Sequence, residues 1–331
     1  MKRSSFMSEA NRRFQTDQLS IESILIEYIN RQTKKWNVDN ISRTLAYQSF
    51  YRHNKEILWP FLASMVSRNA GWNMTDLQIY EFRQILSPEK RYSIFQTYER
   101  ANWLIFSDAY PQLLLYEVSK QIGEPLFHLL DEFNVSSFMK KEWETYWLDR
   151  DQKRIDQALI INEQNVIQLP VIENDELDQK VLSTVPFWLQ DRFHFSTVLF
   201  PTIQGELYGL SVHGFKKLKN RIALGKRLLK ILSEHDLRQA ICLFAQRTEP
   251  TGARVDYEQY LQRVRRGHRL PLRVMYPIIN HHRRPSEDWS IDRPPTKQYF
   301  KDVELPKKIK LNDWYEHKRL ELYMLSKLTT L

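Results

Sequence analysis

The sequence predicts an all-α protein, an irregular bundle of roughly ten or more helices with a proline-rich, non-helical arm before the C-terminal helix. Apolar residues recur at steps of three and four along most of the chain, which is the period of an amphipathic helix. Only eight of the 331 residues are Gly, fewer than a protein rich in β-turns needs. Nine Trp, sixteen Tyr and 42% apolar residues can fill a core in a chain of this length.

The first part of the chain has helical periodicity and several clear boundaries. Gly71 ends one apolar run, as expected of a residue that stops a helix in the left-handed conformation. Ser87-Pro88-Glu89 combines a cap, a proline at the first helical position and an acid in the first turn, so a helix starts there. Ser136 or Ser137 caps another. Helices are expected over residues 17–36, 40–51, 57–71, 75–86, 88–109, 110–123, 138–148 and 151–165.

The second part of the chain mixes helices with irregular segments. Residues 166–172 are expected to be extended, because β-branched residues around Pro170 disfavour a helix. Asn312 or Asp313 caps a last helix that runs through Leu328. Prolines at 271, 277, 285, 294, 295 and 306 break residues 268–313 into the arm. The other helices are expected over residues 215–232, 236–246 and 256–266.

Composition shifts near residue 170, from aromatic and balanced to acidic and then strongly basic, which indicates a domain boundary. The predicted organisation is a flexible N-terminus (1–16), an aromatic-rich helical domain (17–170) and a basic helical region with the arm and the C-terminal helix (171–331). The two folded parts can also pack as one domain.

The basic charge of the chain is concentrated in one segment. Residues 210–273 hold 15 Lys or Arg and five Asp or Glu, a net charge of +10, whereas the whole chain has +9. The helix expected at 215–232 has leucines on one face and cations on the other. Five like charges on one face repel one another unless an anion binds there. The predicted polyanion-binding residues are Lys216, Lys219, Lys226, Arg227, Lys230, Arg263, Arg265 and Arg266, which Arg269 and Arg273 could extend.

Three partners fit such a face. Duplex nucleic acid is favoured, since aromatic residues that would stack on single-stranded bases are few there. An anionic membrane is the second candidate, with the leucine face inserted. A helix that simply packs on a core and leaves its basic face in water is the non-functional alternative, and is given equal weight.

A second candidate site is a cluster of polar residues in the first half. Asn69 and Asn102 lie on apolar stripes, so their amides are expected to be buried and to share a hydrogen-bond network. One interpretation is a small-ligand pocket or an enzyme site in which Glu99 and Asp108 act as acid and base. The favoured interpretation is structural, because no nucleophile or His accompanies them. The cluster comprises Arg68, Asn69, Trp72, Asn73, Glu99, Asn102 and Asp108.

Three segments of the first half also carry a resemblance to a known family. Residues 36–40 (WNVDN), 65–77 (MVSRNAGWNMTDL) and 99–104 (ERANWL) are similar to the YppC-like proteins of Gram-positive, spore-forming bacteria, a family defined as a domain of unknown function. The resemblance covers most of the chain and is most specific around residues 68–76. It implies a bacterial cytoplasmic protein and transfers no catalytic residue.

Several function classes lack their signatures. There is no HExxH motif, CxxC pair, GxGxxG or P-loop, so neither a metal site nor a cofactor is expected and a non-enzymatic protein is favoured. The single cysteine, Cys242, has no disulfide partner in the chain and lies among apolar residues, which suggests a packing role and a reducing cytoplasm. Neither a signal peptide nor an apolar run of about 18 residues is present.

Overall fold

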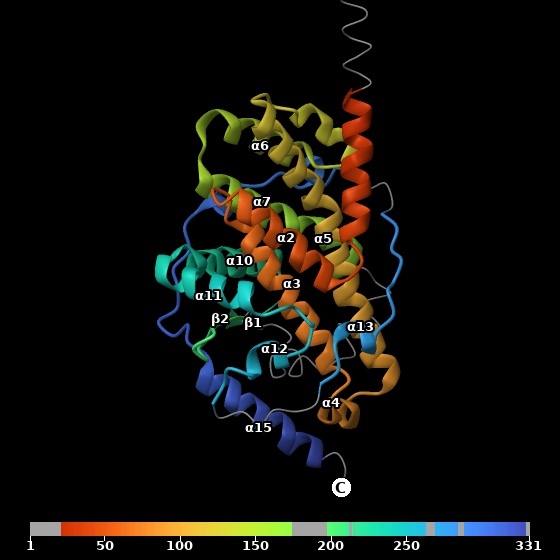
Figure 1. The fold of residues 1–331 in the computed structure, drawn as a ribbon, viewed down its shortest axis with the longest axis vertical. Coiled ribbons are helices and arrows are strands. Elements are labelled where there is room, and N and C mark those ends of the chain that lie inside the picture. The colour runs from red at the N-terminus through yellow and green to blue at the C-terminus, as the bar shows by residue number, and fades with distance from the viewer. Residues whose placement is uncertain are drawn as a thin grey trace, which may run out of the picture.

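The structure is a computed structural model that describes residues 21–173, 197–211, 214, 216–262, 269–283 and 288–328. It confirms the all-α class (Figure 1). Residues 21–36 are helical. The further helices are α2 (Asn40–His53), α3 (Trp59–Asp76), α4 (Tyr80–Ile85), α5 (Pro88–Ile122), η1 (Phe127–Phe133), α6 (Ser137–Asp149), α7 (Gln152–Val166), η2 (Gln168–Ile172), α10 (Leu218–Ser233), α11 (His235–Arg247), α12 (Val255–Glu258), α13 (Leu272–Met275), α14 (Trp289–Asp292), η4 (Lys297–Phe300) and α15 (Asn312–Leu328).

A β-hairpin is the one sheet among the described residues. Strands β1 (Thr197–Pro201) and β2 (Leu207–Ser211) pair antiparallel, with Leu199 opposite Gly209. In Figure 1 the hairpin lies beneath α10 and α11, on the side of the molecule away from the helix of residues 21–36. The chain segment near residue 310 pairs with the outer edge of β2, where the N–H of Gly209 donates to the carbonyl of Ile309 at 2.9 Å.

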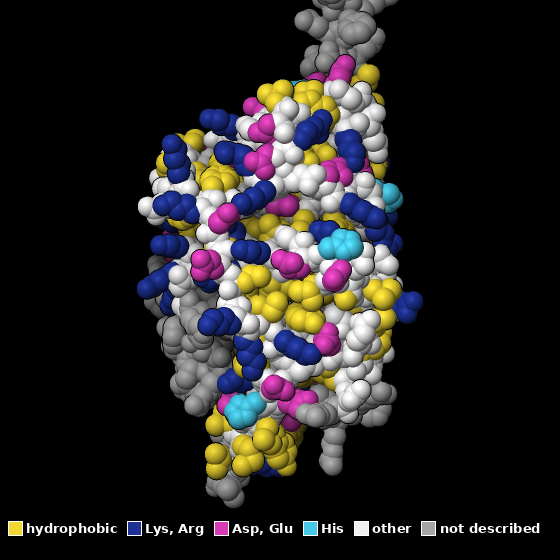
Figure 2. All heavy atoms as spheres, turned by 90° about the vertical axis from the view of Figure 1, so that its left-hand side faces the viewer, with side chains coloured by type: hydrophobic (Ala, Val, Ile, Leu, Met, Phe, Trp, Pro, Cys, Tyr) yellow, Lys and Arg dark blue, Asp and Glu magenta, His cyan; other side chains and the backbone are white. Residues whose placement is uncertain are grey.

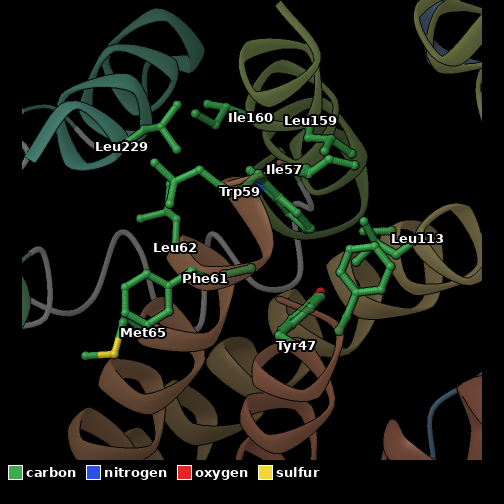
Figure 3. Close-up of a cluster of buried hydrophobic side chains, with 14 of the residues drawn as sticks. Tyr47, Ile57, Trp59, Phe61, Leu62, Met65, Leu113, Leu159, Ile160 and Leu229 are labelled. Carbon is green, nitrogen blue, oxygen red and sulfur yellow. The ribbon is translucent and has the colours of Figure 1, made fainter. Parts of the chain in front are cut away.

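The main hydrophobic core is built around the start of α3. Trp59 is fully buried there, between α2 and α7, and its indole lies edge-on to the ring of Tyr47 (Figure 3). Leu159 and Ile160 of α7 and Leu229 of α10 close the same cluster. The core therefore draws on both parts of the chain that the composition separates at residue 170. The boundary itself stays a prediction.

Helix α7 also caps α3 from a distance. The N-cap residue of α3, Leu58, makes no side-chain capping bond. Instead the carboxylate of Asp156 accepts the backbone N–H of Trp59 at 2.7 Å, and Glu163 accepts the indole N–H of Trp59 at 3.1 Å. Backbone donors left open at a helix start need an acceptor, and a carboxylate suits them well. Trp59 is thus held at its backbone and at its ring by one helix.

This cap makes stability depend on pH. Burial raises the pKa of Asp156 to about 7, although the N–H groups of Leu58 and Trp59 favour its charged form. Because the folded state then holds the proton more tightly than the unfolded state, Asp156 makes the protein less stable as the pH rises from about 4 to 7. The Asp156→Asn variant should lack this pH dependence. Its free energy of unfolding, measured by urea denaturation, should exceed that of wild type increasingly as the pH rises through this range, by up to about 4 kcal/mol.

Asp156→Ala separates the charge from the cap. It removes the carboxyl too, so it should show the same pH slope as Asp156→Asn, but with stability lower by about 1 kcal/mol at every pH because the α3 cap is lost. An Asn variant that follows the wild-type slope would contradict the assignment.

Most predicted helix starts are confirmed. The hydroxyl of Ser87 accepts the N–H of Lys90 at the start of α5, and that of Ser136 accepts the N–H of Met139 at the start of α6. Helix α15 runs from Asn312 to Leu328, close to the expected extent, but the Oδ1 of Asn312 accepts the N–H of Leu207 in β2 at 3.0 Å instead of capping the helix. The proline-rich stretch before it is confirmed as a largely non-helical arm with only short helical turns.

Five boundary predictions were wrong. The helix expected over residues 75–86 begins only at Tyr80, because Thr75 and Asp76 belong to the end of α3, and the helix expected over residues 256–266 ends at Glu258 as the short α12.

Helix α3 continues through Gly71, because the glycine gives close access to another backbone: a Cβ there would lie 3.2 Å from the Cα of Gly252. Helix α5 runs unbroken past Pro111 to Ile122, since Leu113 and its apolar neighbours are buried on both sides of the proline. Residues 168–172 form a π-helical turn that packs on α5, rather than an extended segment.

Candidate functional site

Helix α10 places its predicted cations on one face, and the arm runs across that face. Lys226 is only 5% exposed, and its ammonium donates to the backbone carbonyls of Tyr299 (2.8 Å) and Lys301. Arg227 donates to the carbonyl of Glu304 and Lys230 to that of Val303, each at 3.1 Å. Three of the four predicted cations that lie on α10 therefore hold the arm in place through backbone acceptors, and the fifth predicted cation, Lys216, precedes the helix.

These contacts leave much positive charge at the surface. Arg227 and Lys230 are still exposed, as are Lys216 and Lys219 at the start of the helix. The arm adds exposed lysines of its own, at positions that the sequence reasoning passed over. Together they make a surface, here named the composite basic surface, formed by Lys217, Lys219, Arg227, Lys230, Lys297, Lys301, Lys307 and Lys308.

No ion pair within the described part of the chain involves any of these eight side chains, and α10 contains no acidic residue. Figure 2 shows the side of the molecule on which α10, α11 and the arm lie in Figure 1. Lys and Arg side chains are spread over much of it, with Asp and Glu scattered among them. Two acids, Asp302 and Glu304, are exposed in the same stretch of the arm as its lysines, and Asp302 is paired with Lys153.

The apolar face of α10 is not accessible. Ile222, Leu228, Leu229, Ile231 and Leu232 are buried, and the helix packs against α7. The contact with α7 is close at Gly225, where an added Cβ would lie 2.8 Å from Ile160. The leucine face that could enter a membrane is thus part of the core.

Part of the charge concentrated in residues 210–273 is used inside the protein. Arg254 pairs with Asp76, and Arg269 pairs with the same carboxylate at 2.7 Å. Arg273 pairs with Asp39 at 2.6 Å. Both acids, Asp76 and Asp39, belong to the first half of the chain. The net charge of +10 counted over residues 210–273 alone therefore overstates the positive charge that is free to meet a partner. Arg263, Arg265 and Arg266 lie outside the described residues.

The polar residues of α3 hold elements from the second half of the chain. Arg68 is buried and donates to the carbonyls of Ala245 (3.1 Å) and Thr248 (2.6 Å) at the end of α11. The amide of Asn69 both donates to and accepts from the backbone of Leu199 in β1, at 2.8 Å each. The Trp72 indole donates to Asp256 at 3.0 Å, and Asn73 accepts from Arg254 at 2.8 Å. This part of the predicted cluster joins the two halves of the fold.

The α5 members of the cluster lie in separate networks. Glu99 forms a buried ion pair with Arg43 of α2, a partner that the sequence reasoning missed. Asp108 accepts from Gln112 (2.7 Å), Asn162 (2.6 Å) and Arg283 (3.0 Å). Burial raises the pKa of Asp108, and the charge of Arg283 opposes that effect.

Asn102 is only half-buried, and its amide donates to the Tyr98 carbonyl of its own helix at 2.8 Å. It shares no network with Asn69, so that expectation was wrong. Glu99 and Asp108, each bound to its own partners nine positions apart on one helix, do not meet as an acid and base pair.

Two further classes of site were sought over the described residues. No helix there is long and apolar enough to cross a membrane. No group of three or more His, Cys, Asp or Glu side chains in that part is arranged to hold a metal ion.

Comparison with known proteins gives a family but no activity. Residues 35–316 match the family model described as "Protein of unknown function (DUF2515)". The chain is 48% identical over 302 residues to "Uncharacterized protein YppC" of Bacillus subtilis strain 168, which covers 91% of this chain and 94% of that protein. No solved structure matches the chain significantly. The resemblance expected from the sequence is confirmed, and the chain belongs to the DUF2515 family of proteins of unknown function.

Proposed function

We propose that this protein is a non-enzymatic binder of duplex nucleic acid, and that the composite basic surface makes the contact. The observation that carries the proposal is the set of eight exposed cations at α10 and along the arm. None of them forms an ion pair with a described carboxylate, although Asp302 lies close enough to Lys230 to interact with its charge. Phosphates can supply the missing counter-charge, and released counterions would drive the association. Contacts of this kind position a duplex but do not read its sequence, so binding should be sequence-independent.

The burial of the α10 leucines favours nucleic acid over membrane. Adsorption of an amphipathic helix to a membrane depends on its apolar face entering the lipid. On α10 that face packs against α7 and the core, so only the electrostatic part of the interaction is open to a membrane. Helix α10 is about 24 Å long, enough to follow the backbone of a duplex for about seven base pairs.

Fluorescence anisotropy with a labelled random-sequence DNA duplex tests the proposal. If about four phosphates are engaged, the logarithm of the binding constant should fall with the logarithm of salt concentration with a slope of about −3.6. The variant to compare is the quadruple change Lys217→Gln, Lys219→Gln, Lys307→Gln and Lys308→Gln. It leaves the cations that hold the arm in place and should flatten the slope by about one for each contact that is lost.

A matched control removes the same charge elsewhere. Lys34, Arg83, Lys90 and Lys141 are also exposed, on other helices, and changing all four to Gln should leave the slope unchanged. Equal loss in both quadruple variants would mean a general effect of net charge and would contradict a defined surface. Binding to anionic vesicles with none to the duplex would overturn the proposal in favour of a membrane.

A further inference from the structure

A cleft between α2, α3, α7 and α11 has the chemistry of an anion site. It has a volume of about 570 Å³, within the range of small-molecule pockets. Its cations are Arg52 in the last turn of α2, Lys55 just after that helix, and Arg238 in the first turn of α11. None of the three forms an ion pair with a described residue. The one carboxylate in the lining, Glu56, is paired with Lys120 at 2.5 Å.

The remaining lining offers hydrogen bonds and an apolar wall. Gln48 is 6% exposed, and its amide nitrogen is buried without a hydrogen-bond partner, which is costly unless something completes the site. The side chains of Gln152, Gln239 and Gln246 add further amides. Tyr51 stacks on Phe61 at 5.0 Å between ring centres and forms the apolar wall.

The start of α11 adds to this polarity. His235, its first residue, lines the cleft, and the N-cap residue Glu234 makes no side-chain capping bond. The open N–H groups and the positive end of the helix dipole favour an anion there. Asp236 lies beside His235 in the same turn and reduces this effect, so the three cations carry most of the attraction.

We infer that this cleft binds a small phosphorylated compound, with Arg52, Lys55 and Arg238 around the phosphoryl groups and Tyr51 beside the less polar part of the ligand. Arginine and lysine recognise phosphate through charge-assisted hydrogen bonds, and a cleft of this size holds more than a single phosphate ion. The site would bind rather than react. Its thiol, Cys242, is half-buried, and burial raises its pKa to about 11, so only a small fraction of it is thiolate near neutral pH and it reacts slowly with an external reagent.

Cys242 provides the test, because it is the single cysteine of the chain and lines the cleft. The rate of its alkylation by N-ethylmaleimide, a neutral reagent, would be followed by mass spectrometry with increasing ATP, pyrophosphate or adenosine. ATP and pyrophosphate should slow the reaction saturably, and adenosine should not. A strand of DNA with a 5′-phosphate, compared with its 5′-hydroxyl form, separates the end of a nucleic acid from a small molecule as the source of the phosphoryl group.

Variants of the cleft cations test whether these side chains bind the ATP that protects Cys242. Protection is the ratio of rates with and without ligand, measured within each variant. Arg238→Gln should raise the apparent Kd for ATP by about tenfold or more, because a charged hydrogen-bond donor to the phosphoryl groups is lost. Lys55→Gln, at an exposed side chain where the change should not affect folding, should act in the same direction. Arg83→Gln, an equal change on the distant α4, should leave the Kd unchanged.

Three outcomes would overturn the inference: no protection by ATP or pyrophosphate, equal protection by adenosine, or the same Kd in Arg238→Gln and Arg83→Gln. The inference stands apart from the proposed nucleic-acid surface. The quadruple Lys→Gln variant of that surface should keep full protection of Cys242 by ATP, so the two proposals can fail separately.

Discussion

Asp76→Asn should lower the free energy of unfolding by about 3–5 kcal/mol, because it removes the charge that pairs with two buried arginines and leaves only Glu258, at 3.4 Å from Arg269, to balance them. Asp76 is 7% exposed and pairs with Arg254 and Arg269, whose side chains are 3% and 8% exposed. Asn keeps the shape of the side chain and part of its hydrogen bonding, so the loss reports the charge. Urea denaturation followed by Trp fluorescence measures it.

Asp302→Asn is the matched control for this change. Asp302 pairs with Lys153 at 2.6 Å, but both side chains are mostly exposed. Pairs of that kind contribute below about 1 kcal/mol, so the same chemical change should have little effect there. Similar losses at the two positions would show that the Asp76 site is solvated and would contradict its assignment as a buried ion cluster.

Gly209→Ala should destabilise the protein by at least about 3 kcal/mol, because it prevents the β-hairpin from closing. A Cβ at position 209 would lie 2.0 Å from the carbonyl oxygen of Val198, a backbone atom that cannot move without separating β1 from β2. The φ angle of Gly209 is also +153°, a value that residues with a side chain rarely adopt. Thermal unfolding and susceptibility to proteolysis near residues 197–211 would both register the change.

Gly123→Ala isolates the backbone contribution. Gly123 also has a positive φ, +79°, where it ends α5, but a Cβ there would meet nothing within 4 Å. Its cost should be about 1–2 kcal/mol, that of the left-handed conformation alone. If Gly209→Ala costs no more than this, the hairpin tolerates a side chain and the close contact with Val198 does not matter for stability.

Local chemistry predicted the helices well. Periodicity and capping residues such as Ser87 and Ser136 act within a few positions, so they can be recognised in sequence. The errors came from distant contacts. A glycine such as Gly71 ordinarily ends a helix, but here it lies inside α3. The backbone of Gly252, 181 positions later, packs so close to Gly71 that a side chain there would crowd it. Pro111 stays helical because tertiary packing outweighs its missing N–H.

The candidate site was only partly predictable for the same reason. The amphipathic pattern placed the α10 cations on one face, and the structure agrees. What covers that face could not be inferred, because the acceptors for Lys226 and Lys230 are backbone carbonyls, which no side-chain pattern marks. Arg254 looked like open charge since its partner Asp76 lies 178 positions earlier. The cations of the cleft come from two elements without any shared motif.

The way in which the arm is fastened has a consequence for sequence divergence. The hydrogen bonds that hold the arm run to backbone carbonyl oxygens, from Lys226, Arg227 and Lys230 of α10. Every amino acid has such a carbonyl, so the side chains of Lys301, Val303 and Glu304 take no part in these bonds. Mutations can therefore accumulate in this stretch of the arm without releasing it, whereas loss of a cation from α10 removes an anchor outright. Within the DUF2515 family we expect positions 303 and 304 of the arm to vary in sequence, while these three positions of α10 and the arm lysines of the composite basic surface remain basic.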